Sequence, residues 1–116
     1  MNKIEYYIIR QRRNSSVLIL IFVYQFKEEL EDFEEIEVKE NKPLFEFLDS
    51  EKILLFVNQH DHKVWIWEGA NTNPRMKFIA VQAAPHVRDK HDITFTITSV
   101  DENNETAAFK ILVGLI

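Results

Sequence analysis

Two stretches of the chain are apolar almost throughout, Val17–Phe26 and the centre of Lys52–Gln59. Continuous apolarity over so few residues is typical of a strand that is covered on both faces. Ile4–Arg10, rich in Ile and Tyr, precedes the first stretch across the polar turn Arg12–Ser16. This order predicts an N-terminal hairpin, and residues 1–35 would add strands to a sheet or a helix against it.

The second apolar stretch is followed by the polar turn His60–Lys63 and by Val64–Trp67. We expect these segments to form another hairpin, with Trp65 and Trp67 on one side of their strand, packed under a helix. Further on, Asp92–Val100 alternates between apolar and threonine positions, which predicts a strand with one buried face. The apolar positions are Ile93, Phe95 and Ile97.

Helical patterns occur in three places. The strongest predicts a long helix over Pro74–Lys90, with Thr72 or Asn73 as its cap and Pro74 in its first turn. Glu105 begins a short C-terminal helix that Gly114 stops, capped by Asn103 or Asn104. The spacing of Phe26, Leu30 and Phe33 predicts another short helix, after which Ile36 and Val38 could open a short strand.

The order of elements in the second half is strand, strand, helix, strand, helix. A helical crossover between strands of one sheet predicts an α+β fold, in which helices cover a central mixed β-sheet. No composition shift divides the chain, so we expect residues 1–116 to form a single domain.

The long helix has two apolar sides. At about 100° per residue, one side is the expected core face, formed by Met76, Ala80, Ala83 and Val87 with Ile79 and Ala84 at its edges. The opposite side carries an apolar stripe with polar neighbours. We predict that this side binds a partner, through Phe78, Val81, Gln82, Pro85, Arg88 and Asp89. The alternative is that residues 1–35, or a second copy of the chain, cover it.

Composition excludes several functions. The chain has 46% hydrophobic and 28% charged residues, a net charge of −5 and no cysteine, so a thiolate metal site and a disulfide framework are impossible. Acidic residues gather in Lys27–Glu40 and the only basic cluster is Arg10–Arg13, which argues against nucleic-acid binding. Val17–Phe26 is too short for a membrane span, and no cleavage site for a signal peptide follows it. We expect a cytoplasmic protein.

Candidate chemistry is sparse. His60–His62 places two imidazoles around a carboxylate, but a polar turn is the better interpretation. His86 and His91 suit the end of the long helix, where partial positive charge is favourable. The acidic segment Asp101–Glu105 could contribute to a calcium site shared with a partner, although capping and solvation are favoured. No nucleophile motif or phosphate-binding loop appears, so we expect neither an enzyme nor a cofactor.

Several motifs from Leu48 to Leu115 occur in a familiar order. A buried strand precedes "VWIWEG", "NTNPRMKFIAVQAA" opens the long helix, and "ITFTITSVDENNE" and "FKILVGL" end the chain. In this order and spacing, the segment resembles a gelsolin-like domain of the gelsolin and villin superfamily. Residues 1–35 have no counterpart in this resemblance and would pack on the gelsolin-like core as an N-terminal extension, an extra β-hairpin.

The resemblance implies a mixed sheet between one long and one short α-helix, and a function on actin. In actin-binding members the long helix docks between two actin subdomains, which would make the stripe on Pro74–Lys90 the binding surface. The expected function is regulation of actin assembly by monomer binding or weak filament capping. Alternatively the fold serves as an interaction scaffold in a trafficking or signalling assembly, or as a homodimer, without affinity for actin. A composition rich in Ile, Lys, Glu and Asn suits an AT-rich microbial genome, including archaea that carry eukaryote-like actins.

The resemblance also implies where calcium would bind in relatives. Their Gly-Asp pair falls on Ser50 and Glu51, and their helix glutamate falls on Met76, with Arg75 before it. Calcium prefers six to eight oxygen ligands, and a thioether beside a guanidinium cannot supply them. We therefore predict that the chain lacks this calcium site.

Overall fold

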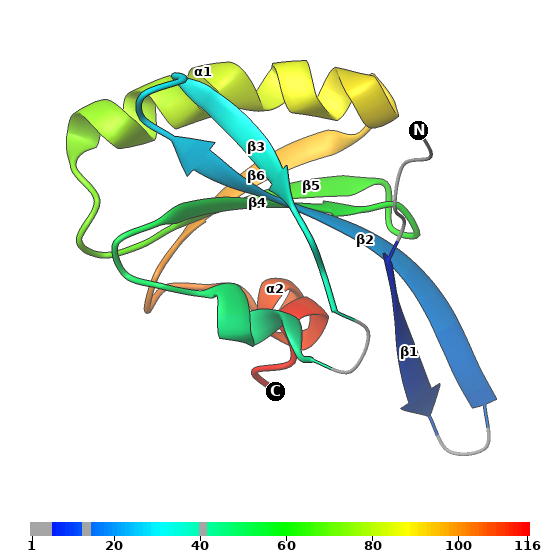
Figure 1. The fold of residues 1–116 in the computed structure, drawn as a ribbon. Helices are drawn as coiled ribbons and strands as arrows, with labels where there is room; N and C mark the ends of the chain where they lie inside the picture. Colours follow the sequence, from blue (N-terminus) through cyan, green and yellow to red (C-terminus); the bar gives the residue numbers. More distant parts are fainter. Residues whose placement is uncertain (1–5, 13–14, 40–41) are drawn as a thin grey trace.

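The computed structural model describes residues 6–12, 15–39 and 42–116, and describes side chains from Leu20 onward. Within these residues, six strands form one mixed sheet that lies between a long helix and a short one (Figure 1). The elements are β1 (Tyr6–Arg12), β2 (Ser15–Lys27), β3 (Asp32–Ile36), the 3₁₀ helix η1 (Leu44–Phe47), β4 (Ile53–Asn58), β5 (Lys63–Glu68), α1 (Pro74–His91), β6 (Thr96–Asp101) and α2 (Ala107–Val113).

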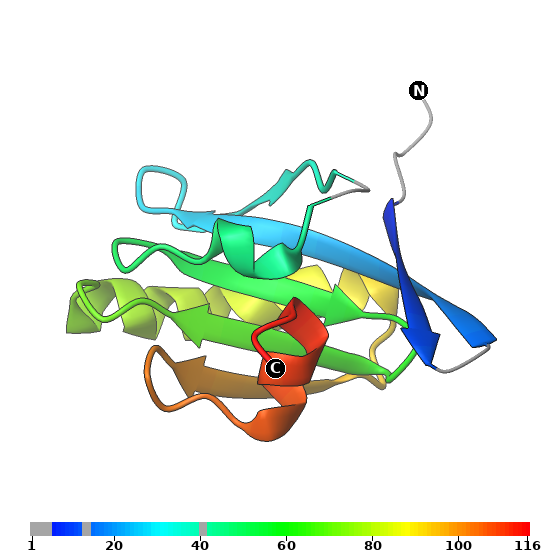
Figure 2. The ribbon, with the colours of Figure 1, turned by 90° about the horizontal axis from the view of Figure 1, so that it is seen from below.

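The strands follow the order β1-β2-β4-β5-β6, and β3 also pairs with β2. Every pair is antiparallel except β5 and β6, which run parallel because α1 carries the chain back across the sheet. Figure 2 shows α2 on one face of the sheet and α1 on the other. The predicted α+β class, with a mixed sheet, a long and a short helix and an N-terminal hairpin, is confirmed.

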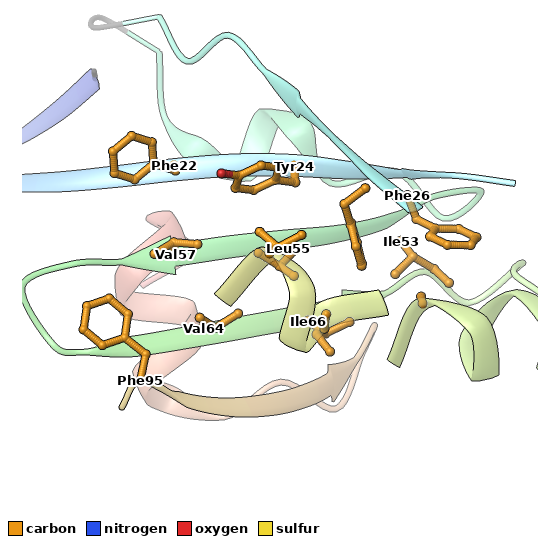
Figure 3. Close-up of a cluster of buried hydrophobic side chains, with 13 residues drawn as sticks. Phe22, Tyr24, Phe26, Ile53, Leu55, Val57, Val64, Ile66 and Phe95 are labelled. Carbon is orange, nitrogen blue, oxygen red and sulfur yellow. The ribbon is translucent and has the colours of Figure 1, made fainter. Parts of the chain in front are cut away.

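Each central strand sends alternate side chains to opposite faces, as the period of two requires. On the α1 face, buried side chains of β2, β4 and β5 point toward the helix (Figure 3); they include Phe22, Tyr24, Ile53, Leu55, Val57, Val64 and Ile66. On the α2 face, Phe109 packs edge-on against Phe56 and Trp65, with ring centroids 5.6 and 5.7 Å apart. Both predictions hold: the apolar strands are covered on both faces, and the tryptophans lie under a helix.

The N-terminal segment supplies strands rather than a helix. Ile21 of β2 pairs with Tyr6 of β1 on one edge and with Asn58 of β4 on the other, so β2 is an interior strand at that point. Residues 13–14 of the predicted turn, and Ile4 and Glu5 of the predicted strand, lie outside the described residues. No helix in the part of the chain that the structure describes combines the length and apolarity that crossing a bilayer requires.

The predicted helix over Phe26, Leu30 and Phe33 is wrong. The segment is a hairpin in which Phe26 and Phe33 are cross-strand partners, with ring centroids 5.5 Å apart. Glu31 adopts a left-handed conformation (φ 50°) that closes the turn. Two overlapping turn hydrogen bonds, from the Leu30 and Glu31 amides, precede β3. The cross-strand pair buries both rings in the cluster beneath α1, and this tertiary contact overrides the helical spacing.

The strand predicted over Asp92–Val100 begins later, at Thr96, and Ile93 is 71% exposed instead of buried. A local turn replaces its first residues, because the Asp92 carboxylate accepts hydrogen bonds from the Thr94 amide (2.8 Å) and hydroxyl (2.6 Å). Aspartate side chains commonly compete with the sheet in this way. Phe95 is buried as predicted.

The caps of the two helices differ in how well they were predicted. Asn73 caps α1, accepting from the Met76 amide at 2.8 Å, as one of the two expected residues. For α2 both expected caps are wrong: Thr106 accepts from the Phe109 amide at 3.3 Å, and the helix begins at Ala107. Asn103 is instead a turn residue with φ 71°.

Thr106→Ala is expected to lower the free energy of unfolding by about 1 kcal/mol, because the Phe109 amide loses its acceptor. Urea unfolding of both proteins measures the change. Asn104→Ala is the matched control and should change little. An equal loss in both variants would contradict the assignment of the cap.

Candidate functional site

The inner face of α1 packs on the sheet. Ala80, Ala84 and Val87 are buried, and Met76, Ile79 and Ala83 pack against them. The predicted core face is confirmed, with Ala84 more deeply buried than Ala83. Small residues at these positions let the helix lie close to the large side chains of β2, β4 and β5 (Figure 3).

The outer face of α1 carries the predicted apolar stripe. Phe78 is 65% exposed and Val81 is 45% exposed, although both are large apolar side chains. Gln82 and Asp89 are exposed, while Pro85 and Arg88 are partly buried. The helix continues through Pro85, and the Arg88 guanidinium donates to the Asp89 carboxylate at 2.9 Å. The described part of the N-terminal segment therefore leaves the stripe open, and its role in binding stays a prediction.

The turn between β2 and β3 lies beside α1 (Figure 1). The Arg75 guanidinium donates to the Glu31 carboxylate at 3.1 Å, and His86 Nδ1 lies 3.7 Å from Asp32 Oδ2. These contacts join residues that are 44 and 54 positions apart in the sequence. Sequence reasoning placed the turn in a helix and so missed this neighbour of the stripe.

Acidic side chains near the start of α1 are engaged with protein donors. Glu51 accepts from the Asn71 side chain at 2.8 Å. Glu102 accepts from the Ser50 hydroxyl at 2.8 Å and from the Ala70 amide at 2.7 Å, so it ties two loops to the end of β6. Among the described residues, no group of three or more His, Asp or Glu side chains could hold a metal ion. Met76, which stands where relatives have their helix glutamate, packs against the core. The absence of a calcium site stays a prediction.

The acidic segment Asp101–Glu105 has a structural role that the sequence did not reveal. Besides the two bonds to Glu102, the Glu105 carboxylate accepts from the Trp67 indole at 2.9 Å. A buried indole N–H requires an acceptor, and Glu105 supplies it across the β5–α2 layer. The only sequence signal was the acidity of the segment, which gave no indication of the donors.

The histidines also have local partners. Asn58 and Asp61 bond each other within the β4–β5 turn, and the His62 ring stacks on Phe95 with centroids 5.4 Å apart. His91 Nε2 lies 2.7 Å from the Tyr24 hydroxyl, across the sheet–helix interface. Burial, with a smaller effect of Glu35, raises the pKa of Tyr24, so its hydroxyl stays protonated. The turn interpretation of His60–His62 agrees with these contacts.

Glu68 is a buried acid at the end of β5, only 8% exposed and directly opposite Asp101 of β6. Burial, a hydrogen bond with Asp101 and the charge of Asp101 raise the pKa of Glu68 to about 7, although Lys77 opposes the shift. A raised pKa means that the folded state holds this proton more tightly than the unfolded state does.

The stability of the protein should therefore fall as pH rises from about 4.5 to about 7, because the unfolded state loses this proton first and folding must then take a proton up again. Glu68→Gln should remove this part of the pH dependence and be more stable than the parent at pH 8 by about 2 kcal/mol. Urea unfolding across pH 4–8 tests this. Parallel pH profiles of the two proteins would contradict the shift.

Solved structures that resemble this chain identify its fold. No protein-family model matches the sequence, and no curated protein matches it. The structure of the Thorarchaeota ProGel/rabbit actin complex contains a similar chain, with a TM-score of 0.66 and 20% sequence identity over 81% of this chain and 99% of that one. The chain has a gelsolin-like fold. At this identity the likeness establishes the fold alone.

A second solved structure, the Thorarchaeota 2DGel3/rabbit actin complex, has a TM-score of 0.55 and 22% identity over 77% of this chain. This chain spans 43% of that longer one. The gelsolin-like resemblance inferred from the sequence is confirmed, and α1 is the long helix of that fold. The stripe of Phe78 and Val81 therefore lies on the long helix of a gelsolin-like fold, facing away from the sheet.

Proposed function

We propose that this chain binds actin through the outer face of α1 and regulates actin assembly by monomer binding or weak filament capping. The observation that carries the proposal is the exposure of Phe78 and Val81 on the long helix. The two solved structures with the same fold, ProGel and 2DGel3, are both complexes with rabbit actin. Their Thorarchaeota source also supports an archaeal origin for this chain.

The chemistry of the stripe suits a groove on a partner. A helix that lies in a hydrophobic groove is anchored by side chains at intervals of three and four residues, and Phe78, Gln82, Pro85 and Asp89 have that spacing. Val81 lies about 60° from Phe78 around the helix. The apolar residues would be buried at the centre, while Gln82, Arg88 and Asp89 would form a polar rim.

One helix gives one contact, so monomer binding or weak capping fits better than filament severing, which would require linked domains. Met76 stands where calcium-binding relatives have a carboxylate ligand, and a thioether does not replace it. Actin binding is therefore expected to be independent of calcium. We also propose that the protein is cytoplasmic, binds no nucleic acid and has no enzymatic activity. If the chain is instead a scaffold or a homodimer, the same experiment will show no effect on actin.

Actin cosedimentation and polymerisation assays, each with calcium and with a chelator, test the proposal. We expect the protein to stay with unpolymerised actin and to reduce the extent of polymerisation equally in both conditions. Unchanged polymerisation, with no protein in the filament pellet and no binding to labelled monomeric actin, would contradict actin binding. Sedimentation of the free protein as a dimer would then favour the homodimer.

A further inference from the structure

We infer that the β2–β3 turn, residues 28–31, is a second contact element for the partner that docks on α1, with Leu30 as its apolar anchor and Glu28 and Glu29 as its charged rim. The partner would then offer an apolar socket bordered by basic side chains next to the start of α1. This inference rests on the proposed function, because its occupant is the same actin molecule.

The turn is held in a fixed place beside the stripe. Phe26 and Phe33 pack against each other at its base, and the Glu31 carboxylate binds Arg75 at 3.1 Å. Phe78 lies about 60° from Arg75 around the helix, because three residues turn it by about 300°. A partner surface that covers Phe78 therefore reaches the edge of the turn, which stands at the level of the helix in Figure 1.

Leu30 is the exposed apolar residue of the turn. Its side chain is 56% exposed, between the acidic residues Glu29 and Glu31. The hydrogen bonds from the Leu30 amide to Lys27 and from the Glu31 amide to Glu28, both 3.1 Å, order the backbone around it. An ordered turn that presents a leucine to solvent loses little entropy when the leucine is buried by a partner.

The charges of the turn indicate the kind of socket. Glu31 is neutralised by Arg75, whereas the carboxylates of Glu28 and Glu29 have no ion pair or hydrogen bond among the described residues. Both are exposed, so they remain hydrated until a partner approaches. Basic side chains around the socket would give complementary charge at the rim, which mainly raises the association rate and depends on salt.

The experiment compares binding of monomeric actin by variants of the full chain. Leu30→Ser should weaken affinity about tenfold, because a buried leucine is lost from the interface. Ile116→Ser, a matched exposed residue near the C-terminus on the α2 side of the sheet, should leave affinity unchanged (Figure 1). Unaltered thermal unfolding of both variants would show that the fold is intact.

A second arm tests the charge. Glu28→Lys/Glu29→Lys should weaken affinity roughly tenfold at about 0.05 M salt, and much less at about 0.5 M salt, because screening removes rim electrostatics. The control Glu37→Lys/Glu46→Lys makes the same charge change on exposed residues away from α1. If the turn variant binds actin as tightly as the parent, or more tightly, the inference that basic side chains border the socket is wrong.

The outcomes separate this inference from the proposed function. If Phe78→Asp abolishes binding while Leu30→Ser binds like the parent, the turn is not a contact element and the proposed function stands. If the parent chain itself does not bind actin, the proposed function fails and the inference fails with it. Loss in both variants, with both controls unchanged, supports the two-element surface.

Discussion

Gly69→Ala is expected to destabilise the protein by about 3 kcal/mol, more than most single substitutions in a domain of this size. A Cβ at this position would collide with the Ser50 carbonyl oxygen, and would lie 2.6 Å from the Ser50 carbonyl carbon and 2.7 Å from the Lys52 carbonyl oxygen. These are backbone atoms, so no rotamer change relieves the contact. The Gly69 and Asn71 amides also donate to Lys52 and Ser50, which would have to move together.

Thermal unfolding measures the effect, and we expect the Tm to fall by about 10 °C. Gly114→Ala is the matched control. Gly114 has a left-handed backbone (φ 89°), but a Cβ there would meet only the Phe45 and Pro43 side chains, at 3.5 Å or more. The control should lose about 1 kcal/mol from backbone strain. A smaller loss at Gly69 than at Gly114 would contradict the packing argument.

Gly69 also shows why part of the fold could be predicted. The apolar stretches at β4 and β5, the capped start of α1 and the glycine between them are local patterns with one good structural solution each. A parallel return strand then follows from the length of α1, since only a crossover places β6 beside β5. These elements agree with their predicted positions within a few residues.

Other parts depended on contacts that the sequence does not display. Phe26, Leu30 and Phe33 have helical spacing, yet Phe33 pairs with Phe26 across a turn closed by Glu31, a residue type that seldom signals a left-handed turn. Ile93 continues the alternation of β6, but the Asp92 carboxylate accepts a hydrogen bond from the Thr94 amide, and the segment forms a turn instead of a strand. In both cases a side-chain or cross-strand contact overrides the periodic pattern.

The candidate site also has one part that the sequence predicts and one part that it does not. The stripe on α1 follows from helix geometry, because the angle between residues is fixed and one core face leaves Phe78, Val81 and Pro85 unaccounted for. The turn beside it could not be predicted, because Arg75–Glu31 and His86–Asp32 connect segments that are distant in the sequence. A surface built from one element was predictable, and its second element required the tertiary structure.

Phe78→Asp is expected to weaken actin binding at least about 100-fold while leaving the fold intact. In a helix-in-groove interface a central aromatic anchor often carries much of the binding energy, and an ionised carboxylate in its place would be buried without a partner. In the free protein the same position is 65% exposed, so the charge stays in water and stability should change by less than about 1 kcal/mol.

The comparison of binding with stability is what makes this variant informative. Ile116→Asp introduces the same charge at another exposed apolar residue, near α2, and should bind actin like the parent. Titration of labelled monomeric actin gives the affinities, and urea unfolding gives the stabilities. A Phe78→Asp protein that unfolds would show that the stripe belongs to the core, and a folded one that binds normally would remove α1 from the interface. Loss of binding in a folded protein assigns Phe78 a role in recognition, because its exposed ring contributes little to packing in the free chain.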